Sequence, residues 1–240
     1  MESVAAVISD CHIPHHDQKA CDVMKGILSV VNPDILIING DLVDFAQISS
    51  FDRQPGEILT LQEDLTKAKK WLKELRQSVP HAEIIYLLGN HEDRLQRYLN
   101  KHPEIHGLDC LKIENLLDLA VINCQLIPKN EYKWHDWLIT HGDVVRANAG
   151  ATAQALITKY GMNGVCGHVH RLALVQKTNF SRTLTWIEGG CLSRLDPQYM
   201  KVADWQQGCT ILRCIDGQVY PELVRINDGK AFYQGAVYKV

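Results

Sequence analysis

The segment ILIINGDLVD, residues 35–44, carries the clearest structural and chemical signal in this sequence. Its first four residues are apolar, which is typical of a strand that is buried on both faces of a parallel sheet. Asp41 and Asp44 follow at the point where such a strand would end. Because ligands of open α/β sheets bind at the carboxyl ends of the strands, this segment predicts both a central strand and part of a polar site.

The same succession of an apolar strand and a polar block occurs on either side of this segment. Residues 4–9 and residues 84–88 are the two further apolar strands. Apolar residues at helical spacing separate the strands, over residues 20–31 behind the candidate N-cap Asp17 and over residues 58–79. Continuous apolar strands that alternate with helices predict an α/β protein built on a parallel sheet. The polar blocks that follow the two strands are Asp10 and His12 after the first, and Asn90, His91 and Glu92 after the second.

The second half of the chain has shorter strand patterns. Two of them precede histidines, with His141 after the first and both His168 and His170 after the second. Two sheets packed face to face, with helices outside, would use all of these strands. Residues 92–120 have a mixed polar and apolar pattern that we interpret as helical, and this insert is a candidate cap over the site. The strands are expected at residues 137–140, 165–166, 183–187, 210–215 and 218–224.

The composition of the 240 residues is typical of a globular protein, with 46% hydrophobic and 22% charged residues. We therefore expect one domain over residues 1–240. No apolar run approaches the ~20 residues of a membrane span, and no basic leader precedes the first strand, so a cytoplasmic protein is expected. The net charge of -3 argues against an extended nucleic-acid-binding surface, because proteins bind nucleic acid largely through basic residues that contact phosphates. Nothing in the sequence indicates an oligomeric state.

The types of polar residue at the strand ends point to metal binding. Asp10 and His12 are separated by one residue, as are His168 and His170, so each pair should point the same way at a strand end. Carboxylate, imidazole and amide donors without thiolates suit Mn²⁺, Fe or Zn²⁺ better than a structural cysteine–zinc site. The set is too large for one ion but suits two ions that share a carboxylate. The candidate ligands are Asp10, His12, Asp41, Asn90, His141, His168 and His170.

A site for two divalent ions indicates a reaction on phosphate groups. Their charge would exceed that of Asp10, Asp41 and a bridging hydroxide, so the centre would attract a phosphate anion. Two-metal sites also lower the pKa of bound water from 15.7 toward about 7, which supplies a nucleophile without a serine or cysteine. Taken singly, each residue has a plainer explanation as a turn cap or an interior histidine. Their joint occurrence at five strand ends favours a site.

These polar blocks, taken in order, resemble the calcineurin-like metallophosphoesterase superfamily. The blocks are Asp-x-His, Gly-Asp-x-x-Asp, Gly-Asn-His-Glu, His-Gly-Asp and Gly-His-x-His, at residues 10–12, 40–44, 89–92, 141–143 and 167–170. They span about two thirds of the chain, and composition is similar to that of small phage and bacterial phosphoesterases. The resemblance implies a four-layer αββα sandwich, in which two mixed β-sheets are flanked by helices.

The resemblance also implies roles for individual residues. Asp10, His12, Asp41 and His170 would hold one ion, with Asp41 bridging, and Asn90, His141 and His168 would complete the second. His91 would protonate the leaving oxygen, Asp44 would orient His91, and Glu92 would support the ligands. Mn²⁺ is the expected metal, and Fe, Zn, Co, Ni or Mg would also fit this ligand set.

The substrate is less well specified by the sequence. Phe45 stands where the protein Ser/Thr phosphatases have an arginine, which argues against a phosphoprotein substrate. Arg94 and Arg97 follow the Gly-Asn-His-Glu block, and either could touch a phosphate, although a solvated helix face is the simpler interpretation. In the irregular stretch 191–208, Tyr199 or Trp205 could stack on a base, or could anchor the loop.

The expected activity is hydrolysis of small phosphodiesters, with nucleotides and the ends of short nucleic acids as candidate substrates. A phosphomonoesterase is the next alternative, because the same metal site serves both reactions. A manganese-dependent nuclease and a non-catalytic protein-binding scaffold on the same fold are the remaining alternatives. The presence of His91 and of every candidate ligand argues against the scaffold.

Overall fold

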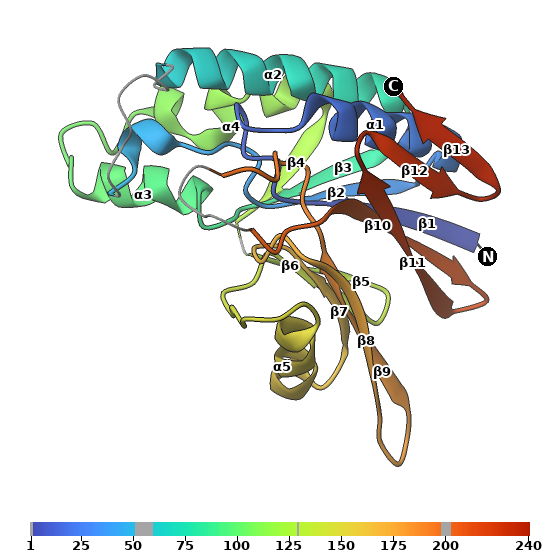
Figure 1. The fold of residues 1–240 in the computed structure, drawn as a ribbon. Coiled ribbons are helices and arrows are strands. Elements are labelled where there is room, and N and C mark those ends of the chain that lie inside the picture. Colours follow the sequence, from blue (N-terminus) through green and yellow to red (C-terminus); the bar gives the residue numbers. More distant parts are fainter. Residues whose placement is uncertain (1, 51–59, 129, 198–202) are drawn as a thin grey trace.

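The first half of the chain alternates strands and helices, as its apolar periodicity predicts. The computed structural model describes residues 2–50, 60–128, 130–197 and 203–240. Strands β1 (Glu2–Ile8), β2 (Ile35–Asn39) and β3 (Glu83–Leu87) are parallel neighbours. Helices α1 (Gln18–Val31) and α2 (Leu61–Ser78) cover one face of these strands (Figure 1).

The ends of these helices follow local sequence signals. The Asp17 side chain accepts a hydrogen bond from the backbone N–H of Ala20, so the N-cap prediction for α1 is confirmed. Thr60 and Glu63 form a capping box at the start of α2. Of the predicted helix over residues 58–79, residues 58 and 59 lie outside the described residues.

The strands form two mixed sheets. The larger has the order β13-β12-β11-β10-β1-β2-β3-β4, in which β1 to β4 are parallel and β10 to β13 are antiparallel. The smaller has the order β5-β6-β7-β9-β8, with a parallel centre and antiparallel edges. The remaining strands are β4 (Cys124–Ile127), β5 (Glu131–Trp134), β6 (Trp137–Thr140), β7 (Asn163–Cys166), β8 (Leu172–Thr178), β9 (Thr183–Gly189), β10 (Gln207–Ile215), β11 (Gln218–Asn227), β12 (Lys230–Tyr233) and β13 (Ala236–Lys239).

Three separate groups of buried apolar side chains define the layers. Along β2, Leu36 and Ile38 face the helices, whereas Ile35 and Ile37 face the smaller sheet, because successive side chains of a strand point to opposite faces. A third group joins the outer face of the smaller sheet to α5 (Ala151–Tyr160). Three interfaces require four layers, so the expected αββα sandwich is confirmed, and Figure 1 shows α5 on the side opposite α1 and α2.

The segment 92–120 is less helical than expected. Helix α3 (Glu92–Asn100) ends near Pro103, which cannot continue a helix. Turns and short helices follow: η2 (Asp109–Leu111), α4 (Ile113–Leu116) and η3 (Leu119–Ile122). Ile113 and Leu119 are buried in the main core, so the later part of this segment forms a wall of the core and is not a free-standing insert. The helical interpretation therefore holds for α3 and the short helices, which turns separate.

Helix α5 has no local capping signal in the sequence. Two backbone N–H groups at its N-terminus donate to the carboxylate of Glu188 in β9, from Gly150 at 2.9 Å and from Ala153 at 3.0 Å. Glu188 is fully buried beside the positive end of the helix dipole. No helix in the described ranges is long and apolar enough to cross a bilayer.

Candidate metal centre

Five loops converge at the carboxyl ends of strands from both sheets. The loops follow β1, β2 and β3 of the larger sheet and β6 and β7 of the smaller sheet. Each of their polar side chains contacts at least one of the others, so the structure brings together all seven candidate ligands and the two candidate catalytic residues. The contacts that join them involve Asp10, His12, Asp41, Asp44, Asn90, His91, His141, His168 and His170.

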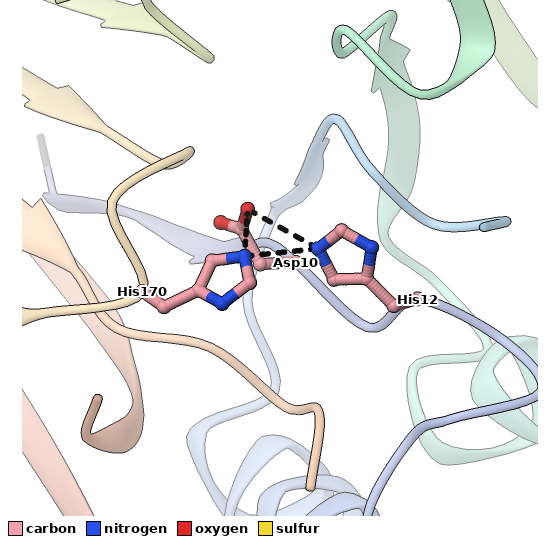
Figure 2. A group of neighbouring side chains, drawn as sticks. All are labelled: Asp10, His12 and His170. Atoms are coloured by element: carbon pink, nitrogen blue, oxygen red, sulfur yellow. Dashed lines mark hydrogen bonds and ion pairs between the residues drawn. The ribbon is translucent and has the colours of Figure 1, made fainter. Parts of the chain in front are cut away.

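Asp10, His12 and His170 form the first donor group (Figure 2). The Nε2 atoms of His12 and His170 face each other at 2.9 Å, and Asp10 Oδ1 lies 3.2 Å from the His170 nitrogen and 3.8 Å from the His12 nitrogen. Two nitrogen ligands about 2.1 Å from one ion are about 3 Å apart when they meet at a right angle. The donor atoms of this group therefore have the spacing that one metal ion requires.

Asn90, His141 and His168 form the second donor group. The Asn90 side-chain oxygen lies 3.1 Å from His141 Nε2 and 2.6 Å from His168 Nδ1. A carboxylate oxygen of Asp41 lies within 4.8 Å of a ring nitrogen of both histidines, so imidazole, carboxylate and amide donors lie close together. This is a ligand set that divalent transition metals accept.

Asp41 lies between the two donor groups. Its Oδ2 atom is 3.7 Å from His12 Nε2 and 3.3 Å from His141 Nε2. The other oxygen, Oδ1, accepts the backbone N–H of His91 at 2.9 Å, which fixes the orientation of the carboxylate. One carboxylate thus faces a histidine of each group, as a bridging ligand must.

The backbone at this centre is in an uncommon conformation. Five of the seven candidate ligands have positive φ angles, between 51° and 69°. Such left-handed residues other than glycine cost about 1–3 kcal/mol each and gather at functional sites. Strand alternation does not account for the shared direction of each Asp or His pair, because both pairs lie beyond the strand ends and have left-handed backbone. The five ligands with positive φ are Asp10, His12, Asp41, His168 and His170.

Outer hydrogen bonds orient the imidazole rings. His141 Nδ1 lies 2.8 Å from the backbone oxygen of Asn39, and His12 Nδ1 lies 3.2 Å from Asp44 Oδ1. In both rings these bonds leave Nε2 facing the centre. Partners of this kind fix the tautomer and orientation of metal-binding histidines.

The charges at the centre are strongly coupled. Burial opposes the charged form of the Asp10 carboxyl, but the neighbouring His170 and His12 outweigh it and hold the pKa of Asp10 well below its usual range. Burial likewise opposes charge on His12 and His141, yet contacts with carboxylates raise the pKa of each histidine to about 10. Burial instead lowers the pKa of His168 and His170. The carboxylates of the centre thus stabilise positive charge at His12 and His141, and they would stabilise a divalent cation in the same way.

His91 and Asp44 form a pair at the edge of the centre. His91 Nδ1 lies 3.0 Å from Asp44 Oδ1, and His91 Nε2 lies 3.8 Å from Asp41 Oδ2. Burial would raise the pKa of Asp44, but its hydrogen bonds to His12 and His91 lower it far more. Asp44 thus stays anionic and holds two histidines at once, one from the first donor group and one outside both groups.

Glu92 joins the loops after β2 and β3. Its buried carboxylate accepts four backbone N–H groups and the hydroxyl of Tyr86, which lies 2.7 Å away. This extends the supporting role expected from the Gly-Asn-His-Glu block, because one anion fixes the backbone of both loops. The backbone donors are Asp41, Leu42, Val43 and Gly89.

Replacing Glu92 by glutamine should destabilise the protein and loosen the centre. The amide NH₂ of glutamine would have to face backbone N–H donors in a buried place, so we expect the free energy of unfolding to fall by about 3 kcal/mol. Urea denaturation measures this loss. The matched control is Asp93→Asn, because Asp93 is the next residue and is exposed beside Arg97. Equal stabilities of the two variants would contradict this role for Glu92.

Two glycines keep the loops close together. At Gly89, a Cβ would overlap the carboxylate and backbone nitrogen of Asp41. At Gly40, where φ is +81°, a Cβ would lie 2.5 Å from the ring nitrogen of His141. The two motif glycines therefore allow neighbouring strand ends to place their ligands in contact.

The candidate substrate contacts differ in their placement. Arg94 turns toward the centre, whereas Arg97 is exposed and pairs with Asp93. The ring of Trp205 packs edge-on against His170, with centroids 4.2 Å apart. Tyr199 lies outside the described residues.

Comparisons with known proteins identify the family of this chain. A family model described as calcineurin-like phosphoesterase matches residues 4–172. The gene 54 proteins of Mycobacterium phages D29 and L5 are 29% and 28% identical to the chain over the full length of both proteins. Vacuolar protein sorting 29 from Cryptosporidium parvum has a similar fold, with a TM-score of 0.54 at 11% identity over 100% of this chain and 99% of that one. The family match covers most of the chain and all five polar blocks, so the protein belongs to the calcineurin-like phosphoesterase family.

Proposed function

We propose that this protein is a hydrolase of phosphate esters that uses two divalent metal ions, with small phosphodiesters as its leading substrate class. The observation that carries the proposal is the position of Asp41 between two groups of metal-type donors, with His91 at their edge. Family membership gives the reaction class. The donor types support Mn²⁺ as the metal.

The protein's own residues would divide the work between binding and proton transfer. The first donor group and Asp41 would hold one ion, and the second donor group with Asp41 would hold the other. When bound, two such ions supply an activated water and neutralise charge on the phosphoryl oxygens. His91 would give a proton to the leaving oxygen, and Asp44 would keep the His91 ring in the productive orientation.

A phosphomonoesterase is the second candidate, because the same donors would serve both reactions. A manganese-dependent nuclease is a further alternative, and the net charge of -3 disfavours it. The similarity to vacuolar protein sorting 29 raises a scaffold role, but at 11% identity it speaks for the fold alone. The His91–Asp44 pair favours an enzyme over a scaffold. A nucleotide-like substrate and a cytoplasmic location complete the proposal.

Metal removal and return tests the proposed activity. Metal-stripped protein should be inactive, and Mn²⁺ should restore hydrolysis of bis(4-nitrophenyl) phosphate and, more slowly, of 4-nitrophenyl phosphate. Mg²⁺ and Zn²⁺ should restore less. Release of 4-nitrophenolate measures each rate. Folded protein that hydrolyses neither ester with any of these ions would count against the hydrolase and favour the scaffold.

A further inference from the structure

Arg94 occupies a defined position beside the candidate catalytic pair. It lies three residues after His91 on α3, a spacing that places two side chains on the same face of a helix. Its Nη1 donates to the backbone oxygen of Asp44 at 2.8 Å, and its Nη2 lies 3.0 Å from His91 Nε2. The side chain is 17% exposed, so Arg94 does not belong to a solvated helix face.

Arg97 provides the contrast within the same helix. Its side chain is 66% exposed, and it pairs with Asp93 on the outer surface. Arg94 and Arg97 have the same chemistry and neighbouring positions in the sequence, yet only Arg94 is directed toward the candidate metal centre. The orientation of Arg94 toward the centre is thus not a general property of the arginines on α3.

Arg94 faces His91 Nε2, which is the ring nitrogen of His91 that points toward the candidate metal centre. His91 Nε2 lies 3.8 Å from Asp41 Oδ2, the carboxylate oxygen that faces both donor groups. A phosphoryl group that meets His91 at this edge would also come within reach of the Arg94 guanidinium. The hydrogen bond to the Asp44 backbone uses one of the five donors of the guanidinium, and Nη1 also lies 3.7 Å from Asp44 Oδ2. When His91 Nε2 carries the proton for the leaving oxygen, the Nη2 donor that faces it would turn to a phosphate oxygen instead, so donors remain for phosphate oxygens.

We propose that Arg94 binds a non-bridging oxygen of the substrate's phosphoryl group and sets the preference between phosphomonoesters and phosphodiesters. This inference rests on the proposed function. A monoester dianion carries one more negative charge than a diester anion, so a fixed positive charge at this point attracts the monoester more strongly. Arg94 therefore lowers the ratio of kcat/KM for diesters to kcat/KM for monoesters. Removing the Arg94 side chain should raise this ratio.

The test compares Arg94→Ala with Arg94→Lys and with the matched control Arg97→Ala, all loaded with Mn²⁺. For Arg94→Ala, kcat/KM should fall about 100-fold for 4-nitrophenyl phosphate and about 10-fold for bis(4-nitrophenyl) phosphate, the range expected for a charge-assisted hydrogen bond. Arg94→Lys should lie between Arg94→Ala and the wild type, because it keeps the charge but loses the planar fork. Arg97→Ala should match the wild type with both esters.

A second measurement separates phosphate binding from support of the Asp44 loop. Titration calorimetry with inorganic phosphate should show at least about 10-fold weaker binding to Mn²⁺-loaded Arg94→Ala, with the metal content and Tm of the wild type. Equal losses for the two esters, or unchanged phosphate affinity, would overturn the inference. If the wild type hydrolysed neither ester, the proposed function would fail, while the phosphate titration would still decide whether Arg94 binds the anion.

Discussion

Asp41→Asn is expected to lose metal-dependent turnover, with kcat/KM falling on the order of 1000-fold or more. The Asp41 carboxylate faces a histidine of each donor group, at 3.7 Å from His12 and 3.3 Å from His141. Asparagine has nearly the same shape and can still accept the backbone N–H of His91, so the substitution removes charge more than structure. We therefore expect both ions to be held more weakly.

The metal content of desalted protein measures this effect directly. The wild type should keep about two Mn²⁺ per chain, as a two-metal site requires, and Asp41→Asn should keep fewer. Asp143→Asn is the matched control, because Asp143 belongs to the His-Gly-Asp block but is 78% exposed and pairs with Lys159. A variant at Asp41 that kept two ions and near-normal turnover would refute the shared-carboxylate arrangement.

The convergence of the polar blocks could be foreseen because it follows from sheet geometry. Parallel strands end at one edge of a sheet, so polar residues after β1, β2 and β3 had to lie close together once the strands were recognised. The continuous apolar run in β2 also required two buried faces. Both conclusions depend on short-range sequence patterns that tertiary contacts do not alter.

Features that depend on distant contacts were not predictable. Helix α5 is capped by Glu188, which lies 35 residues beyond Ala153 in the sequence, so no local signal marked the start of the helix. Strand β8 lies at a sheet edge and has mostly exposed or half-buried residues, which hides its pattern. The left-handed turns at Asp10 and His12 also had no signal, because neither residue is a glycine.

Orientation within one helix was equally hidden. Arg94 is the candidate substrate contact of the sequence, but periodicity alone does not explain why Arg94 and not Arg97 faces the centre, since both follow the Gly-Asn-His-Glu block at helical positions. The different orientations of the two arginines depend on where α3 begins relative to the metal centre. Glu92 anchors this start to the loop after β2, and His91 faces Asp41. That anchor joins residues about fifty positions apart, which single-sequence periodicity does not detect.

His91→Ala should lower kcat by about 100-fold to 10,000-fold, the range for loss of a general acid. The loss should depend on the leaving group. A 4-nitrophenolate leaves without a proton, whereas an alkoxide requires one, so an alkyl phosphodiester should lose more rate than its aryl counterpart. His102→Ala serves as the control, because His102 lies just beyond the end of α3, is half-buried and pairs with Glu104.

Metal content distinguishes an acid from a ligand at this position. His91, His12 and Asp44 also form a cluster whose donor atoms lie within 4.8 Å of one another, so the geometry alone would allow His91 to share a metal. If His91 is the acid, His91→Ala keeps both ions while its turnover falls. If an ion is lost with the imidazole, or if aryl and alkyl esters lose equal rate, His91 acts through the metals and the proton donor must be sought elsewhere at the centre.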